Sequence, residues 1–313
     1  MLLPLLLAAA LEADPAATPP SAETTRFALA VEGNAAVQSD TYGNAANDSN
    51  ANGQRAGGNL DFTFYLGHPL VDDDAPRSLQ PFLQRTSTLA LHGGGLYEHV
   101  DYSLRANGGA YRQDYTDESI ATRVFILDNV ALLGSLGVNY LHDARVPDVA
   151  LPTSRNVLEP EGSIGVDVRS GDSSLALSWQ LVGVHQESTQ IPAGAWRDVF
   201  WPRLSLAGRT VLGHQYDLTA SIVAIPDGIE ARAGLGIYPT KDLGFSAALE
   251  VDHGQIYLDN ATDYDRVFGN LGVSYWILPR VNAGLTYTPT RVSWATNDQW
   301  SQQLSVSLTA RLP

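Results

Sequence analysis

The chain has 313 residues, of which 44% are hydrophobic and only 17% are charged, and its formal net charge is -15. The negative charge disfavours a nucleic-acid partner, because phosphate binding needs clustered Lys and Arg. The absence of cysteine excludes a disulfide framework, a thiolate nucleophile and a lipid anchor on cysteine. After the first dozen residues no apolar run approaches the ~20 residues of a membrane-spanning helix, which excludes a helical membrane protein.

The N-terminus predicts export. Residues 2–11 form an apolar stretch that is too short to span a membrane but has the length of a secretory signal, and Ala8, Ala10 and Ala13 offer cleavage positions. The positively charged start that usually precedes such a stretch is absent. We expect a signal peptide over residues 1–13, a Pro/Ala-rich periplasmic spacer over 14–24 and a barrel over 25–313. The alternative is a hydrophobic N-terminus on a cytosolic protein.

From residue 25 onward, apolar side chains alternate with small or polar ones, as in strands that have one face in an apolar environment. In the last segment Leu304 and Val306 share one face, and Ser305 and Ser307 share the other. The pattern predicts an all-β, transmembrane, antiparallel up-and-down barrel of about sixteen strands, within a range of roughly 14 to 18. A soluble sandwich or propeller is the competing fold, because it shares the period of two.

The predicted strands include four near residues 85–92, 96–106, 110–116 and 120–128. The connections carry the stronger argument for a barrel. Short turns are expected at 128–129, 170–172, 212–214, 239–241 and 278–280, and long polar loops at 34–57, 143–159, 186–199, 254–264 and 289–300. This alternation of short and long connections places the turns in the periplasm and the loops outside, a sorting that a sandwich does not require.

A barrel of this size encloses a water-filled channel unless another segment enters it. Facing acids and bases would create a transverse field in that channel, which suits polar solutes such as sugars. The alternative is that these charges pair along the wall and only stabilise it. The charged side chains that we expect to line the lumen are Asp61, Asp101, Arg105, Asp167, Arg169, Arg203, Arg209, Asp217, Glu230, Arg232, Glu250 and Arg311.

One connection on the expected periplasmic side, residues 67–84, is long. Its acidic run precedes Pro76 and would favour the start of a helix. We predict a short helix that closes the periplasmic mouth, a docking surface for a periplasmic partner, or both, and a solvated turn is the alternative. A calcium site at the acidic run lacks the alternate spacing of ligands. The residues of this predicted gate or docking site are Asp72, Asp73, Asp74, Leu79, Phe82 and Leu83.

Sequence motifs of enzymes are missing. There is no GxSxG elbow, no phosphate-binding GxxxxGK[ST] loop and no histidine pair at the spacing of metal ligands. His99, Asp101 and Ser103 suggest a hydrolytic trio, but consecutive residues on one face of a strand lie ~6.6 Å apart. We therefore expect no enzyme, no cofactor and no metal, with an outer-membrane lipid hydrolase as the alternative.

Over residues 25–312 the strand pattern and the unequal connections resemble the porin-like outer-membrane barrels of Gram-negative bacteria. Residues 72–85, DDDAPRSLQPFLQR, are similar to a segment of barrels that accompany polysaccharide-export systems. The resemblance implies a pore in the bacterial outer membrane that passes polar solutes, with outer-membrane lipids, a periplasmic polysaccharide-export protein and a glycan cargo as partners. The alternative is a plugged structural or adhesin-like barrel without transport.

Overall fold

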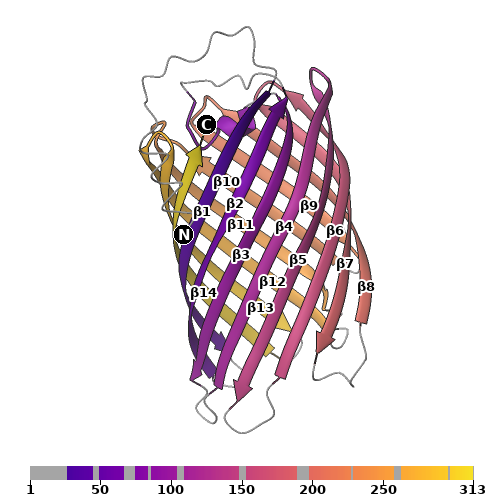
Figure 1. The fold of residues 1–313 in the computed structure, drawn as a ribbon, viewed down its shortest axis with the longest axis vertical. Coiled ribbons are helices and arrows are strands. Elements are labelled where there is room, and N and C mark those ends of the chain that lie inside the picture. The colour runs from indigo at the N-terminus through magenta and orange to yellow at the C-terminus, as the bar shows by residue number, and fades with distance from the viewer. Residues whose placement is uncertain are drawn as a thin grey trace.

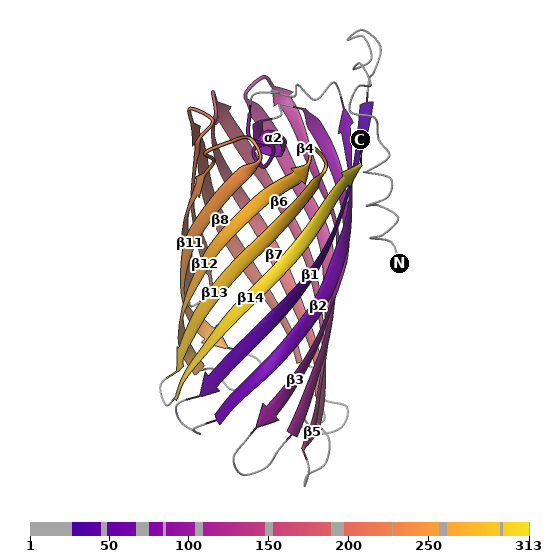
Figure 2. The same ribbon diagram turned by 90° about the vertical axis from the view of Figure 1, so that its left-hand side faces the viewer.

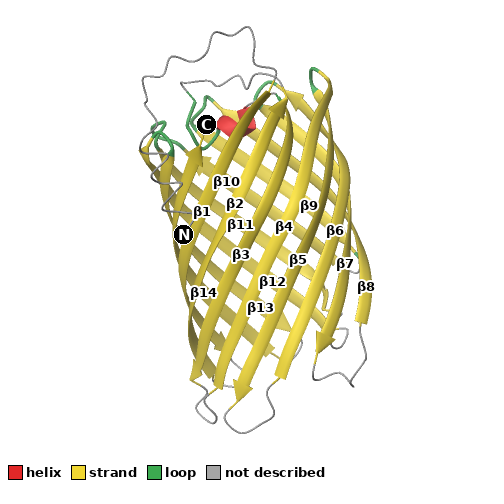
Figure 3. Ribbon diagram, viewed as in Figure 1, coloured by secondary structure: helices red, strands yellow, loops and turns green. Residues whose placement is uncertain are grey.

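The computed structural model describes residues 27–44, 49–66, 75–83, 86–103, 109–147, 153–188, 197–226, 228–256, 262–294 and 297–312. Within them almost every residue belongs to a strand, and the helix α2 (Gln80–Leu83) lies at one end of the molecule (Figure 3). The predicted signal peptide and spacer lie outside the described residues.

The strands are β1 (Phe27–Asn44), β2 (Ser49–Leu66), β3 (Ser87–Ser103), β4 (Gly109–Leu127), β5 (Val130–Pro147), β6 (Thr153–Ser170), β7 (Ser173–Ser188), β8 (Arg197–Leu212), β9 (Tyr216–Ile225), β10 (Gly228–Ile237), β11 (Leu243–Ile256), β12 (Thr262–Leu278), β13 (Val281–Trp294) and β14 (Asn297–Leu312).

The strands form one closed, tilted barrel (Figure 1). Each strand pairs antiparallel with its neighbours in sequence, and β1 pairs with β14 in a register that sets Val37 opposite Val306. Closure pairs the strands on both sides over most of the barrel, so the backbone hydrogen bonds can be satisfied inside lipid, and residues 197–203 of β8 pair with β7 alone. The predicted fold class is confirmed, with fourteen strands among the described residues instead of the sixteen expected.

The two surplus strands come from two breaks that the structure does not contain. β3 continues through the three glycines of residues 93–95, and β4 continues through residues 117–119. The glycines pair with β2 on one side and with β4 on the other, as in the register of Gly95 with Gly58 and Thr116. Glycine weakens a strand, but the backbone hydrogen bonds to β2 and β4 hold residues 93–95 extended.

The predicted long loops are partly strand. β1 continues to Asn44 and β2 begins at Ser49, so that most of residues 34–57 form a paired hairpin in which Gly43 faces Asn50. In the other four predicted loops the flanking residues also belong to strands, whereas residues 148–152, 189–196, 257–261 and 295–296 lie outside the described residues. The predicted loop boundaries were wrong because apolar alternation indicates only where a strand contacts lipid. Where both faces of a hairpin meet water, the pairing continues without that alternation.

The outward face of the barrel carries a broad apolar band. Leu136 and Ile164 are each 66% exposed, and Val306 is 57% exposed. Such a surface would promote aggregation in water, but it is what a bilayer requires of a spanning barrel. Within the part of the chain that is described, no helix is long and apolar enough to cross a membrane.

Polar side chains replace the apolar band toward one end of the barrel. There Arg291 of β13 pairs with Asp298 of β14 at 2.7 Å, and His253 of β11 pairs with Asp265 of β12 at 2.8 Å. These four residues have the same strand parity as the lipid-facing ones. We call this the loop end, and the pairs mark where the lipid band stops.

The opposite end of the barrel carries tight turns, and we call it the turn end. Gly171 and Gly213 adopt φ values of 56° in two of these turns, a left-handed conformation that costs glycine nothing. β14 finishes at this end, and α2 lies there within the ring of strands (Figure 2). Because outer-membrane barrels keep short turns in the periplasm, the turn end faces the periplasm.

Candidate functional site in the barrel lumen

The charged residues predicted to line the lumen lie on the face opposite the apolar band wherever the structure describes their side chains. The register shows this, because Glu250 pairs with Arg232 while the neighbouring Leu249 and Val251 are exposed on the outer face. The side chain of Asp101 and all of Arg105 lie outside what is described. The inward residues are Asp61, Asp167, Arg169, Arg203, Arg209, Asp217, Glu230, Arg232, Glu250 and Arg311.

Many of these charges pair along the wall. Arg209 of β8 makes two 2.8 Å hydrogen bonds to Asp217 of β9. Arg203 reaches over β9 to Glu230 of β10 at 2.5 Å. The bidentate contact between Arg209 and Asp217 fixes both side chains in place. The alternative reading of the sequence, cross-strand pairing, is therefore present in the structure.

Pairing does not remove all charge from the lumen. The side chain of Arg232 is 52% exposed, and the nearest carboxylate oxygen, on Glu250, lies 4.0 Å away. Beside it, Arg209 and Arg232 flank a recess of about 370 Å³ on the β7–β10 wall, with Ala176 and Ala207 among its lining residues. This β7–β10 recess has two arginines at its rim.

A second polar cluster joins β2, β3 and β4. The His92 ring contacts Asp61 through Nδ1 and Asp117 through Nε2, the latter at 3.1 Å, and Asn59 donates a 2.5 Å hydrogen bond to Asp61. Both ring nitrogens donate hydrogen bonds only in the imidazolium, because only that form carries a proton on each nitrogen. The sequence did not reveal this cluster, because the predicted breaks at 93–95 and 117–119 separated its members.

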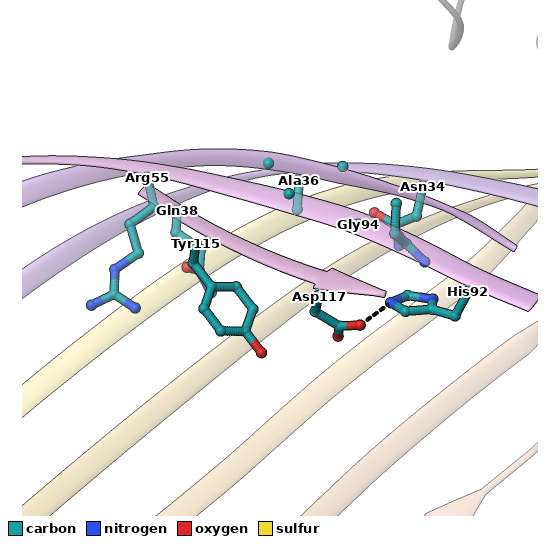
Figure 4. A pocket seen from close by; sticks show the side chains of 12 residues that line it. Asn34, Ala36, Gln38, Arg55, His92, Gly94, Tyr115 and Asp117 are labelled. Atoms are coloured by element: carbon teal, nitrogen blue, oxygen red, sulfur yellow. Dashed lines mark ion pairs between the residues drawn. The ribbon is translucent and has the colours of Figure 1, made fainter. Parts of the chain in front are cut away.

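A recess of about 260 Å³ lies against this cluster on the inner wall of β1–β4. Figure 4 shows Arg55, Tyr115, Asp117 and His92 projecting from the strands to the same side, into the barrel. We call it the β1–β4 recess. The recess lies at the middle of these four strands and opens into the lumen. The sequence did not predict its position.

Residues 75–83, which we call the mouth segment, lie inside the turn end. Leu79 is fully buried. The backbone N–H of Arg77 donates to the carbonyl of Lys241, at 3.1 Å, and its side chain contacts Asp242 at 2.6 Å. The Trp276 indole N–H donates to the Ser78 hydroxyl at 3.2 Å. The first half of the segment is thereby tied to the β10–β11 turn and to β12.

The second half of the mouth segment meets a different part of the wall. The Cζ atom of Arg209 lies 4.1 Å from the centre of the Phe82 ring, and that of Arg169 lies 5.1 Å from it. Arg169 also donates a 2.8 Å hydrogen bond to the Phe82 carbonyl. Since these arginines stand on β6 and β8, the segment extends across the mouth from the β10–β12 side.

Other predicted residues of the mouth are placed as follows. Leu83 ends α2 and is half-buried. Asp72, Asp73 and Asp74 lie outside the described residues. Among the residues that are described, no group of three or more His, Cys, Asp or Glu could hold a metal ion. The side chains of the suggested hydrolytic trio at 99–103 are not described.

Comparison with known proteins gives structural neighbours only. The sequence matches no protein-family model and no curated protein. The fold is similar to the translocator domain of the autotransporter NalP from Neisseria meningitidis, with a TM-score of 0.46, 12% identity, and coverage of 98% of this chain and 94% of that one. It is also similar to Omp33 of Acinetobacter baumannii (TM-score 0.45, 14% identity, coverage 91% and 98%) and to OpdO of Pseudomonas aeruginosa (0.42, 10%, 91% and 98%).

The class follows from the chain's own residues. An even number of antiparallel strands closes the barrel, apolar side chains cover its outer band, and charged side chains line its interior. The chain has the architecture of a porin-like β-barrel of the bacterial outer membrane.

Proposed function

We propose that the barrel is a pore without enzymatic activity that passes polar solutes across the outer membrane, and that the mouth segment narrows its periplasmic opening. The observation that carries the proposal is the exposure of charged side chains inside the barrel. The side chains of Arg203, Arg232 and Asp117 are 31%, 52% and 34% exposed, although all three face inward. In a filled interior such groups would be buried and fully paired, because burying an uncompensated charge is costly.

The same lining defines which solutes can pass. Guanidinium, carboxylate and hydroxyl groups hold water at the wall, so an apolar solute gains nothing by entering. Solutes that exchange hydrogen bonds with water for hydrogen bonds with the wall lose little free energy on passage. Sugars and other small polar molecules belong to this class.

Export of a polysaccharide is a finer form of this proposal. The position of the mouth segment supports it, because a periplasmic export protein that delivers a glycan would meet the barrel at the turn end. The plugged structural barrel is the second candidate. It is favoured by the contacts that hold the segment across the mouth, from Asp242 on one side to Arg169 and Arg209 on the other.

Conductance in planar bilayers separates the two candidates. The wild-type protein is compared with a variant in which residues 67–85 are replaced by an Asn-Gly turn, which suits a tight hairpin. We expect ion conductance from the wild type and a higher conductance from the variant. A silent wild type with a conducting variant would favour the plugged barrel, and two silent proteins would overturn the pore. Heat-modifiable migration on gels serves as the control that both barrels are folded.

A further inference from the structure

We propose that the β1–β4 recess is a subsite for one ring of a neutral saccharide. The inference rests on the proposed pore, because the recess opens to the lumen and a solute reaches it only from there. Its volume of about 260 Å³ gives room for a small ring and not for a folded chain. Three features of the recess carry the assignment: its floor, its hydrogen-bonding rim and its charges of both signs.

The floor is flat because three neighbouring strands place minimal side chains at their inward positions. Ala36 of β1 pairs with Gly57 of β2, and Gly94 of β3 pairs with Asn59 of β2. A Cβ atom on Gly94 would lie 3.3 Å from the Asn59 Cβ and from the His92 Nε2, so a larger residue there would press on the cluster. A floor of alanine and glycine lets a ring lie close to the wall.

The rim presents donors and acceptors together. Arg55 donates, Asp117 accepts, and the Gln38 amide does both. Within the described residues, the Gln38 amide and the Tyr115 hydroxyl have no hydrogen-bond partner in the protein. A sugar hydroxyl also donates and accepts, so adjacent hydroxyls of one ring can match such a rim. The Tyr115 ring adds an apolar surface against which the C–H face of a sugar can pack (Figure 4).

The charges around the recess are of both signs. Arg55 is positive, Asp61 and Asp117 are negative and bracket the His92 ring, and the carboxylates of Glu159 and Glu161 act on Tyr115. The carboxylates disfavour an anion and Arg55 disfavours a cation, whereas a neutral solute that hydrogen-bonds with both loses nothing by the local field. The β7–β10 recess differs in this respect, since Arg209 and Arg232 flank it.

The test uses binding of maltotriose to the full-length barrel in detergent micelles, measured by isothermal titration calorimetry, which does not need an open channel. Ala36→Leu fills the floor of the β1–β4 recess and removes no hydrogen-bonding group. Ala207→Leu fills the β7–β10 recess in the same way and is the matched control. We expect Ala36→Leu to weaken maltotriose binding by about tenfold or more and Ala207→Leu to leave it unchanged. Heat-modifiable migration verifies that both variants fold.

No heat of binding in the wild type, or equal losses in both variants, overturns the subsite. Succinate and lysine are titrated as charged probes, and the neutral assignment is also overturned if either binds more tightly than maltotriose and is lost in Ala36→Leu. The proposed pore is tested separately, by conductance. A barrel that conducts but does not bind maltotriose removes the subsite alone, whereas one that binds without conducting removes the pore alone.

Discussion

Phe82 is the residue on which the hold of the mouth segment can be tested most directly. Its ring lies under the guanidinium groups of Arg209 and Arg169, with Cζ-to-centroid distances of 4.1 and 5.1 Å. A cation–π contact contributes about 0.5 to 1 kcal/mol at exposed sites and about 2 kcal/mol when it is desolvated. Phe82 is only half-buried, so the two contacts together contribute about 1 to 3 kcal/mol to docking of the segment.

Phe82→Ala should therefore shift the equilibrium between the docked and released segment by roughly 5- to 150-fold toward release. The hydrogen bond from Arg169 to the backbone carbonyl at residue 82 survives the substitution, which keeps the effect from being larger. Single-channel recordings should show a greater fraction of time at high conductance. Because the chain has no cysteine, a Cys introduced at Gln80 provides a second readout through its labelling rate.

Phe82→Tyr is the matched control, since it keeps an aromatic ring between the arginines. It should behave like the wild type in both measurements. If Phe82→Ala changes neither conductance nor labelling, or if Phe82→Tyr is as disruptive as Phe82→Ala, the arginine–ring contacts do not hold the segment.

Three further substitutions test other parts of the structure. Arg at Val306, on the lipid face, should cost ~2 to 4 kcal/mol of unfolding free energy in liposomes and Arg at Ser307 far less, and equal losses would contradict the assignment of the two faces. Asp167→Ala removes the carboxylate that lies 2.9 Å from the buried guanidinium of Arg169, and it should destabilise the barrel by about 3 kcal/mol. An unchanged melting temperature would argue against a structural role for the pair. Gly171→Ala should lower the free energy of unfolding by about 1 to 2 kcal/mol because residue 171 has a positive φ. Gly208→Ala should lower it less, because the new Cβ meets only ordinary contacts. The reverse order would refute the turn conformation.

The sequence allowed the barrel to be predicted because lipid contact imposes apolar alternation on every strand. It did not allow the strand ends to be predicted, because that alternation stops at the edge of the lipid while the hydrogen-bonded ladder continues, as it does from Gly43 to Asn50. The pattern also suggested a break in β3, because the glycines at 93–95 have no side chains from which a period could be read, and a break in β4, because residues 117–119 are all polar.

The inward charges were predictable one by one, but their partners were not. Alternation gives the face of a residue, and the pairing of Arg203 with Glu230 across an intervening strand depends on register and side-chain reach. The same holds for the mouth. The length of residues 67–84 marked that connection as unusual, whereas the convergence of Arg169 and Arg209 on Phe82 exists only in the closed barrel.

The extension of the strands beyond the apolar band has a consequence for how the cell surface presents this protein. β1 and β2 have 18 residues each, whereas crossing the lipid takes ~9 to 11. The surplus of about 7 residues, at the tilt of a barrel strand, raises the β1–β2 side of the loop end by about 18 Å above the bilayer, whereas β9 and β10, with 10 residues each, have no such surplus. Over the described residues, the outward-facing part on the β1–β2 side is therefore paired backbone, which resists proteolysis better than an unpaired loop does, and it walls one side of a vestibule above the membrane.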